Sequence, residues 1–258
     1  MKTFIYSTVI AGAMAVAPLT AANAATIVDV ELSLLIDVSG SVDNSEFNLQ
    51  RQGYVDAFNS STIHDLITST ANGRLGQIAV NVIYWSGASQ QAEAVGWTVI
   101  DSAAAASSFA STLAGAARTS NGNTAPGSAI NYAVNSINGN DITGTSTVID
   151  VSGDGERNEG ANTAAARDAA IAGGVTRING IAIGGTSLKN WYEDNIMGGT
   201  DAFVLQATSF DTFGEAIYKK LYHEIGGTNP NPVPLPAAAW LLGGAIAGLG
   251  MMRRRQRG

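Results

Sequence analysis

The sequence predicts an α/β fold in which a doubly wound, mainly parallel sheet is flanked by helices and forms a single domain. Short β-rich runs alternate along the chain with amphipathic or alanine-rich stretches, which is typical of parallel strands joined by helices. Leu32, Leu34, Leu35 and Ile36 form a near-continuous apolar run, as expected of a central strand that is buried on both faces. The 258 residues are 45% hydrophobic, which is ample for one buried core.

Strands are expected where β-rich runs lie between turn residues, at residues 31–36, 77–85, 93–99, 146–151, 177–183 and 202–205. The run at 77–84 alternates cleanly, which suits a strand nearer the edge of the sheet. Helices are expected at residues 45–59, 102–114, 126–136, 161–172, 187–196 and 210–224. In the last of these, Phe213, Ile217 and Leu221 recur every four residues, so one apolar stripe should pack on the sheet.

Charge and cysteine content exclude several classes of function. The chain carries a formal net charge of -7. Nucleic-acid binding needs lysine and arginine gathered to neutralise phosphates, so we expect no nucleic-acid partner. The sequence contains no cysteine, which excludes disulfides, thiolate catalysis and zinc sites built on cysteine. A chain without thiols suits an oxidising or a reducing compartment equally well. The compartment must therefore be inferred from the two ends of the chain.

The N-terminus has the organisation of a secretory signal peptide. Lys2 is followed by an apolar stretch at residues 4–19, and then by Ala22 and Ala24 at the two positions that a signal peptidase reads. We therefore predict a signal peptide at residues 1–24, which is removed before the mature domain at residues 25–226.

The C-terminus predicts a membrane anchor. Residues 227–232 have the composition of a linker, residues 235–252 carry no charge, and an arginine-rich end follows at 253–257. An apolar segment of this length could just cross a hydrocarbon core, which needs about 20 residues. The arginines would stay on the cytoplasmic side, which leaves residues 25–232 outside the cytoplasm.

Residues 233–258 also resemble the C-terminal sorting signals of Gram-negative bacteria. The segment Val-Pro-Leu-Pro-Ala at 233–237 is followed by the Gly/Ala-rich apolar segment and the arginine cluster. This order resembles the PEP-type signals, here in the variant spelled V-P-L-P-A. The resemblance implies cleavage by a membrane protease of the exosortase type, after which the protein would reach the cell surface or the extracellular space.

Three side chains at alternate positions directly follow the first predicted strand. Asp37, Ser39 and Ser41 supply one carboxylate and two hydroxyls, and in an extended or turning loop this alternation lets all three converge on one point. Hard cations take oxygen ligands, and Mg²⁺ usually keeps some waters. A site with two neutral hydroxyls and one or two carboxylates is under-neutralised, so it would bind a further carboxylate from outside.

This D-x-S-x-S motif after an apolar strand resembles the opening of the metal-ion-dependent adhesion site (MIDAS) of von Willebrand factor type A domains. The resemblance implies a doubly wound, Rossmann-like fold whose site is completed by a threonine from a second loop and an aspartate from a third. Thr124, before a helix that begins at Pro126, and Asp154, in a Gly-Asp-Gly turn, match these two positions. Residues 148–155 resemble a little-characterised bacterial subfamily of these domains.

The same resemblance implies a cofactor and a partner. The cofactor would be a divalent cation, Mg²⁺ before Ca²⁺ or Mn²⁺. The partner would be a protein with an exposed Asp or Glu, or a second copy of this chain, whose carboxylate takes an open position on the metal.

The third loop has two candidate aspartates. Ile-Asp-Val-Ser-Gly occurs at residues 36–40 and again at 149–153, so Asp150 holds the place in its segment that Asp37 holds in the first. We favour Asp154 because glycines flank it and a metal loop needs close approach of the backbone there. Asp150 stays as the alternative.

The remaining polar candidates have ordinary structural interpretations. His64 and His223 lie on or beside predicted helices without the spacing of zinc ligands, and the chain has no G-x-S-x-G motif. Glu156 and Glu159 belong to a charged surface loop that could shape the rim of the metal face. We therefore expect no catalytic residues and no enzymatic activity.

Three functions are compatible with these patterns, in decreasing order of preference. The first is an exported binding or adhesion module that captures an acidic group of a partner protein through a divalent cation. The second is a structural surface or biofilm-matrix protein in which the metal only stabilises the loops. The third is a metal-assisted hydrolase, for which Glu156 or Glu159 would have to act as general base.

Overall fold

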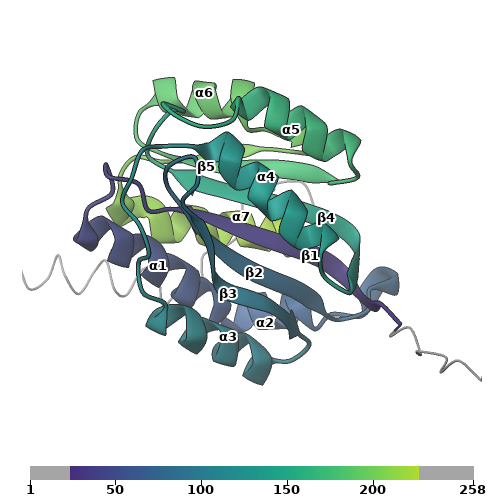
Figure 1. The fold of residues 1–258 in the computed structure, drawn as a ribbon. Coiled ribbons are helices and arrows are strands. Elements are labelled where there is room, and N and C mark those ends of the chain that lie inside the picture. The colour runs from purple at the N-terminus through teal and green to yellow at the C-terminus, as the bar shows by residue number, and fades with distance from the viewer. Residues whose placement is uncertain (1–23, 227–258) are drawn as a thin grey trace, which may run out of the picture.

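The computed structural model describes residues 24–226, which form one sheet between two layers of helices (Figure 1). The strands are β1 (Thr26–Asp37), β2 (Ile78–Trp85), β3 (Gln91–Ile100), β4 (Ile142–Gly153), β5 (Arg177–Ile183), β6 (Gly198–Gly199) and β7 (Val204–Ala207). The helices are α1 (Asn44–Phe58), α2 (Ser61–Ile67), α3 (Ala103–Gly115), α4 (Pro126–Asn138), α5 (Thr163–Ala172), α6 (Thr186–Asn195) and α7 (Phe213–Gly226). Short 3₁₀ turns lie at Ala71–Gly73 and Phe210–Thr212.

The sheet is mainly parallel, as predicted. Its strand order is β3-β2-β1-β4-β5, and β5 also pairs with both β6 and β7. Only β3 and β6 run antiparallel to their neighbours among the described strands. The chain therefore winds outward from the central β1 in both directions, and the predicted doubly wound single domain is confirmed.

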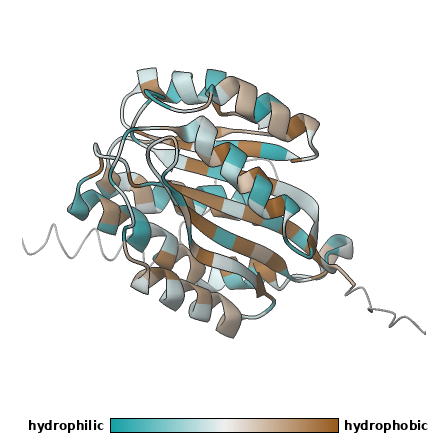
Figure 2. Ribbon diagram, in the orientation of Figure 1, coloured by the Kyte–Doolittle hydropathy of each residue, from teal (hydrophilic) through white to brown (hydrophobic). Residues whose placement is uncertain are grey.

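The two faces of the sheet carry separate hydrophobic cores. Helices α1, α2, α3 and α7 cover one face, and α4, α5 and α6 cover the other. Strand β1 contributes to both cores, because Leu34 points to the first and Leu35 to the second, and both side chains are fully buried. Figure 2 shows hydrophobic residues concentrated along β1 and β2, between helices that also carry hydrophilic residues. The predicted burial of the central strand on both faces is confirmed.

Several elements differ from the sequence prediction. The helix α2 and the two-residue strand β6 were not predicted, because α2 has only Ile63 and Ile67 as buried residues and β6 consists of two glycines. Strand β4 begins before the predicted residue 146, and it includes Gly144, where an added Cβ would lie 2.8 Å from the backbone of Glu31. Strand β2 lies second from the edge, but all of its residues are buried.

The predicted signal peptide (1–24), linker (227–232) and sorting signal (233–258) lie outside the described residues, apart from Ala24. Between residues 24 and 226, none of the helices combines the length and the apolar character that a membrane span requires.

Candidate metal site

The predicted cation ligands come together where β1 and β4 end. Asp37 is the last residue of β1, and Asp154 directly follows β4. Ile36 pairs with Ser152 in the sheet, so both loops leave the same edge. This is the carboxyl edge of the parallel strands, where ligands bind in open α/β folds.

The second loop reaches the same edge just before α4. The N–H of Gly40 donates to the carbonyl oxygen of Gly122 at 2.8 Å, which joins the first loop to the second. Thr124 is buried, and a Cβ added to Gly155 would lie 3.5 Å from its side chain. Thr124 therefore faces the third loop, and the structure brings all three predicted loops together.

Hydrogen bonds connect the candidate ligands in series. The N–H of Ser39 donates to Asp37 Oδ1 at 2.8 Å, and the hydroxyls of Ser39 and Ser41 lie 3.2 Å apart. Ser41 Oγ donates in turn to Asp154 Oδ1 at 2.7 Å. Asp37 is fully buried, whereas Ser41 is exposed. The cluster thus runs from a buried carboxylate to a hydroxyl that is exposed to solvent.

Without a cation, the ionised forms of the two carboxylates in the cluster, Asp37 and Asp154, are destabilised. Burial raises the pKa of Asp37 to about 7, with a smaller contribution from the charge of Asp154, against hydrogen bonds from Ser39. Burial also raises the pKa of Asp154, which the hydrogen bond from Ser41 opposes. The second oxygen of Asp37, Oδ2, is buried without a hydrogen-bond partner among the described residues. A bound cation would stabilise the ionised form of both groups.

The donor set suits a hard divalent cation. Its members Asp37, Ser39, Ser41, Thr124 and Asp154 offer only hydroxyl and carboxylate oxygens, which Mg²⁺ and Ca²⁺ prefer. In the part of the chain that the structure describes, no group of three or more His, Cys, Asp or Glu side chains could hold a metal ion. A cation at this edge of the sheet would therefore depend on the hydroxyl ligands.

Asp150 lies away from this cluster. It pairs with Leu34 in the sheet, three residues before Asp37, which corresponds to about 10 Å along the strand. Its carboxylate forms an ion pair with Lys220 of α7, and Lys220 also lies 2.6 Å from Glu224. The two aspartates of the repeated segment, Asp37 and Asp150, therefore lie at different positions along their strands. Of the two candidates for the third loop, Asp154 is the one that contacts Ser41.

Sequence reasoning missed the residues that hold the first loop in place. The guanidinium of Arg118 donates to the carbonyl oxygens of Val38 at 2.9 Å and Ser39 at 2.8 Å. Gln50 Nε2 of α1 donates to the carbonyl oxygen of Asp37 at 2.9 Å, and Gln50 Oε1 accepts from Ser152 Oγ at 2.8 Å. A buried glutamine on the inner face of a helix is a signal in principle, but its partners are distant in the sequence.

Tyr192 of α6 is a further neighbour that sequence reasoning missed. It is fully buried, and its hydroxyl has no hydrogen-bond partner among the described residues. A Cβ added to Gly153 would lie 2.6 Å from Asp37 Oδ2 and 2.7 Å from the Tyr192 hydroxyl oxygen. Gly153 therefore lets both polar groups approach the backbone, consistent with the close approach predicted for the glycines of this turn.

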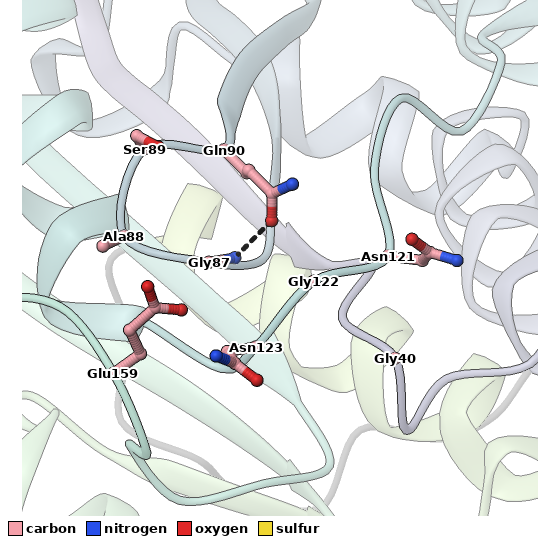
Figure 3. Close-up of a pocket in the computed structure, with 9 residues that line it drawn as sticks. All are labelled: Gly40, Gly87, Ala88, Ser89, Gln90, Asn121, Gly122, Asn123 and Glu159. Carbon is pink, nitrogen blue, oxygen red and sulfur yellow. Dashed lines mark hydrogen bonds between the residues drawn. The ribbon is translucent and has the colours of Figure 1, made fainter.

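A pocket of about 540 Å³ opens beside the cluster (Figure 3). It is formed by Gly40, the turn at 87–90 between β2 and β3, the loop at 121–123 and Glu159. Of the two predicted rim carboxylates, Glu159 lines this pocket, and Glu156 is exposed and does not.

The two histidines lie in helices and outside the cluster. His64 Nε2 is bonded to the carbonyl oxygen of Phe58 at 2.7 Å. His223 of α7 is buried and packs edge-on against Phe203 and Tyr222.

Comparison with known proteins identifies relatives by family and by fold. A family model described as "Protein of unknown function (DUF1194)" matches residues 27–229. No curated protein matches the chain. Among solved structures, proximal thread matrix protein 1 from the mussel byssus has 17% identity and a TM-score of 0.58, and the match covers 78% of this chain and 48% of that one.

Two further solved structures are similar. One is the same mussel protein with a zinc-occupied MIDAS motif, at 16% identity and a TM-score of 0.53, covering 77% of this chain and 45% of that one. The other is the pilus adhesin SpaC from Lactobacillus rhamnosus GG, at 13% identity and a TM-score of 0.54, covering 79% and 31%. This chain thus matches less than half of each of them, and at these identities the likeness shows the fold alone.

Proposed function

This chain belongs to the DUF1194 family and has the fold of a von Willebrand factor type A domain, and on that premise we propose that it is a divalent-cation-dependent binding module. The cation, Mg²⁺ in the first place, is held by a set of five side chains: Asp37, Ser39, Ser41, Thr124 and Asp154. A carboxylate of a partner protein, or of a second copy of the chain, completes the coordination.

The observation that carries this proposal is the fully buried carboxylate of Asp37, whose Oδ2 atom has no hydrogen-bond partner within residues 24–226. Burying an ionised carboxylate without a compensating partner costs several kcal/mol. Such a group is therefore paired with a cation or coordinates a metal. The N–H of Ser39 donates to the other oxygen of Asp37, and the hydroxyls of Ser39 and Ser41 lie 3.2 Å apart. Hydroxyl ligands are neutral, so Asp37 and Asp154 carry the only charges in the ligand set. Together they can balance the two positive charges of the cation but do not exceed them. Mg²⁺ prefers six ligands in octahedral geometry, so five side chains leave a position that a carboxylate of the partner can take.

The similar structures support the coarser role. They include a pilus adhesin and a matrix protein whose MIDAS motif holds zinc, which supports metal-dependent adhesion. The identity of the ion and of the ligand belong to the proposal.

We place the module outside the cytoplasm, because of the predicted signal peptide. Before processing, the apolar segment at 235–252 anchors it to the inner membrane with the domain in the periplasm. Cleavage by an exosortase-type protease then delivers it to the cell surface or the medium.

The test is capture of envelope proteins by the purified, immobilised full chain in Mg²⁺ and in EDTA, with bound proteins identified by mass spectrometry. We expect proteins that bind in Mg²⁺ and are lost both in EDTA and in Asp37→Ala. The matched control is Asp141→Ala, which removes an exposed carboxylate just before β4, at the opposite edge of the sheet. It should leave binding intact.

Binding that survives chelation would contradict the proposal. So would a chain that keeps its partners in Asp37→Ala and loses only thermal stability, since the metal would then be a structural stabiliser.

A further inference from the structure

The pocket beside the candidate metal site shares its loops with that site. Gly40, which lines the pocket, lies between Ser39 and Ser41, and the lining residue Asn123 immediately precedes Thr124. A ligand that contacts the metal would therefore have this pocket beside it. The polar groups that line the pocket therefore determine which chemical group of the ligand can bind next to its acidic group.

Glu159 supplies the pocket with an unpaired carboxylate. The residue is half-buried, and its side chain makes no hydrogen bond or ion pair with any described residue. Its N–H donates to the carbonyl oxygen of Thr124 at 3.3 Å, which fixes it next to the second metal loop. A Cβ added to Gly87 would lie 3.1 Å from Glu159 Oε2. Figure 3 shows the carboxylate directed toward the turn at 87–90, with Asn123 beside it.

The other polar groups of the pocket are amides. Gln90 Oε1 accepts from Ser86 Oγ at 3.0 Å and from the N–H of Gly87 at 3.2 Å, so the side chain is fixed across the pocket wall (Figure 3). The side chains of Asn121 and Asn123 are exposed and make no hydrogen bonds with described residues. Figure 3 shows Asn123 on the side of Glu159, where its amide oxygen can accept a hydrogen bond from a donor-rich group held by the carboxylate.

The residues that line the pocket include neither lysine nor arginine, and no aromatic side chain. An anionic group would meet the Glu159 carboxylate without a compensating cation. A sugar ring would lack the aromatic face on which such rings commonly stack. An ammonium or guanidinium group, by contrast, finds the Glu159 carboxylate with the amide of Asn123 beside it (Figure 3), and hydrogen bonds between two ionised groups are among the strongest in proteins.

We infer that this pocket binds a basic side chain, so that the module recognises a protein segment with an acidic residue on the metal and a Lys or Arg a few residues away. This inference rests on the proposed function, because the acidic residue brings the segment to the site. The pocket then adds specificity: it distinguishes partners that offer an acidic residue alone from partners that offer the pair.

The test uses synthetic peptides as probes. Each peptide carries one Asp and one Lys separated by zero to three glycines, and a matched series carries norleucine, a neutral isostere, in place of Lys. Binding to the purified full chain is measured in Mg²⁺ by fluorescence anisotropy. At the best spacing we expect the Lys peptide to bind roughly tenfold more tightly than its norleucine counterpart, a gain typical of one charge-assisted hydrogen-bonded contact. The gain should shrink as salt is added.

Two variants locate the gain. Glu159→Gln should remove it and leave binding of the norleucine peptide unchanged, because the metal site is untouched. The matched control is Glu156→Gln, which makes the same change in charge three residues earlier on an exposed side chain outside the pocket. It should keep most of the gain.

Each remaining outcome decides against one proposal or both. Equal affinity for Lys and norleucine peptides overturns the inference and leaves the proposed function standing, and so does a gain that survives Glu159→Gln. A gain that both variants reduce equally shows diffuse charge attraction and also overturns the inference. If no Asp peptide binds in Mg²⁺, the proposed function fails, and the inference fails with it.

Discussion

Asp37 is the residue on which the metal site depends most. It is fully buried. One oxygen of its carboxylate accepts a hydrogen bond from the N–H of Ser39, and the other has no hydrogen-bond partner in the described part of the chain. Burial raises its pKa to about 7, so the metal-free chain keeps the proton under mildly acidic conditions. A cation needs the ionised carboxylate, and metal binding therefore competes with this proton.

The competition predicts a pH-dependent stabilisation by Mg²⁺. Because the folded pKa of about 7 exceeds the ordinary value of 3.8, the folded metal-free chain binds more protons than the unfolded chain between these values. Its stability therefore falls as pH rises toward about 7, and Mg²⁺ offsets this loss. The rise in melting temperature on adding Mg²⁺ should be large at about pH 8 and nearly absent at about pH 5.

Differential scanning fluorimetry in Mg²⁺ and in EDTA measures this difference at each pH. Burial also raises the pKa of Asp150, and the charge of Lys220 opposes this shift. Its effect on stability is the same in Mg²⁺ and in EDTA, so it cancels in the difference between the two melting temperatures. Asp37→Asn should abolish the Mg²⁺ effect throughout. A Mg²⁺ effect that stays constant from pH 5 to 8 would contradict the assignment.

Two glycines of the third loop give a second prediction at the scale of single residues. Gly153→Ala would place a Cβ 2.6 Å from Asp37 Oδ2, whereas Gly155→Ala would make an ordinary contact of 3.5 Å with Thr124. Gly153→Ala should therefore lower Mg²⁺ affinity at least tenfold and cost about 1–3 kcal/mol of stability through overpacking. Gly155→Ala should change both much less. Isothermal titration calorimetry and urea unfolding check this, and similar behaviour of the two variants would refute it.

At the scale of the elements, a buried ion cluster joins α7 to the sheet. Lys220 is fully buried between Asp150 of β4 and Glu224 of its own helix, and Asn179 Nδ2 of β5 donates to Glu224 Oε1 at 2.8 Å. Desolvating these charges is costly, so they are stable only together. The cluster explains why an aspartate lies in the middle of a buried strand.

Removing the cation of this cluster should destabilise the fold strongly. Lys220→Met leaves the buried carboxylates of Asp150 and Glu224 without their cation, which costs about 3–5 kcal/mol. The matched control is Lys219→Met, which breaks an exposed pair with Glu215 on the same helix and should cost less than about 1 kcal/mol. Urea unfolding measures both. Equal stability of the two variants would show that the cluster does not hold α7.

The sequence predicted those elements whose signal is local. Residue spacing predicts the apolar run of β1 and the apolar stripe of α7. The first metal loop follows directly from Asp37, Ser39 and Ser41. The partners of Asp150 could not be predicted, because Lys220 follows Lys219 and has the sequence context of a surface lysine. Its burial depends on how α7 packs over β1, β5 and β7.

The supports of the metal loops were missed for the same reason. Arg118, Gln50 and Tyr192 come from three separate segments, and only the tertiary fold brings them to the loops at the ends of β1 and β4. The choice between Asp150 and Asp154 likewise depended on strand register, which a repeated pentapeptide does not reveal.

At the scale of the whole molecule, the described domain begins and ends away from the metal edge. Strand β1 starts at Thr26, at the amino edge of the sheet. Near the end of α7, the carbonyl oxygen of Glu224 accepts a hydrogen bond from Arg177, the first residue of β5, at the same edge. The candidate site lies at the opposite, carboxyl edge. The candidate site and the last turn of α7 therefore lie at opposite edges of the sheet, which leaves the carboxyl edge clear of the C-terminal end of the described domain.

The most direct test of the central claim is anomalous diffraction from crystals of the chain grown with Mn²⁺ in place of Mg²⁺. We predict one strong anomalous peak at the carboxyl edge of the sheet, bordered by the hydroxyls of Ser39 and Ser41 and within reach of Asp37, Thr124 and Asp154. Absence of a peak there at saturating Mn²⁺, or an ion held instead by the buried cluster of α7, would contradict the account.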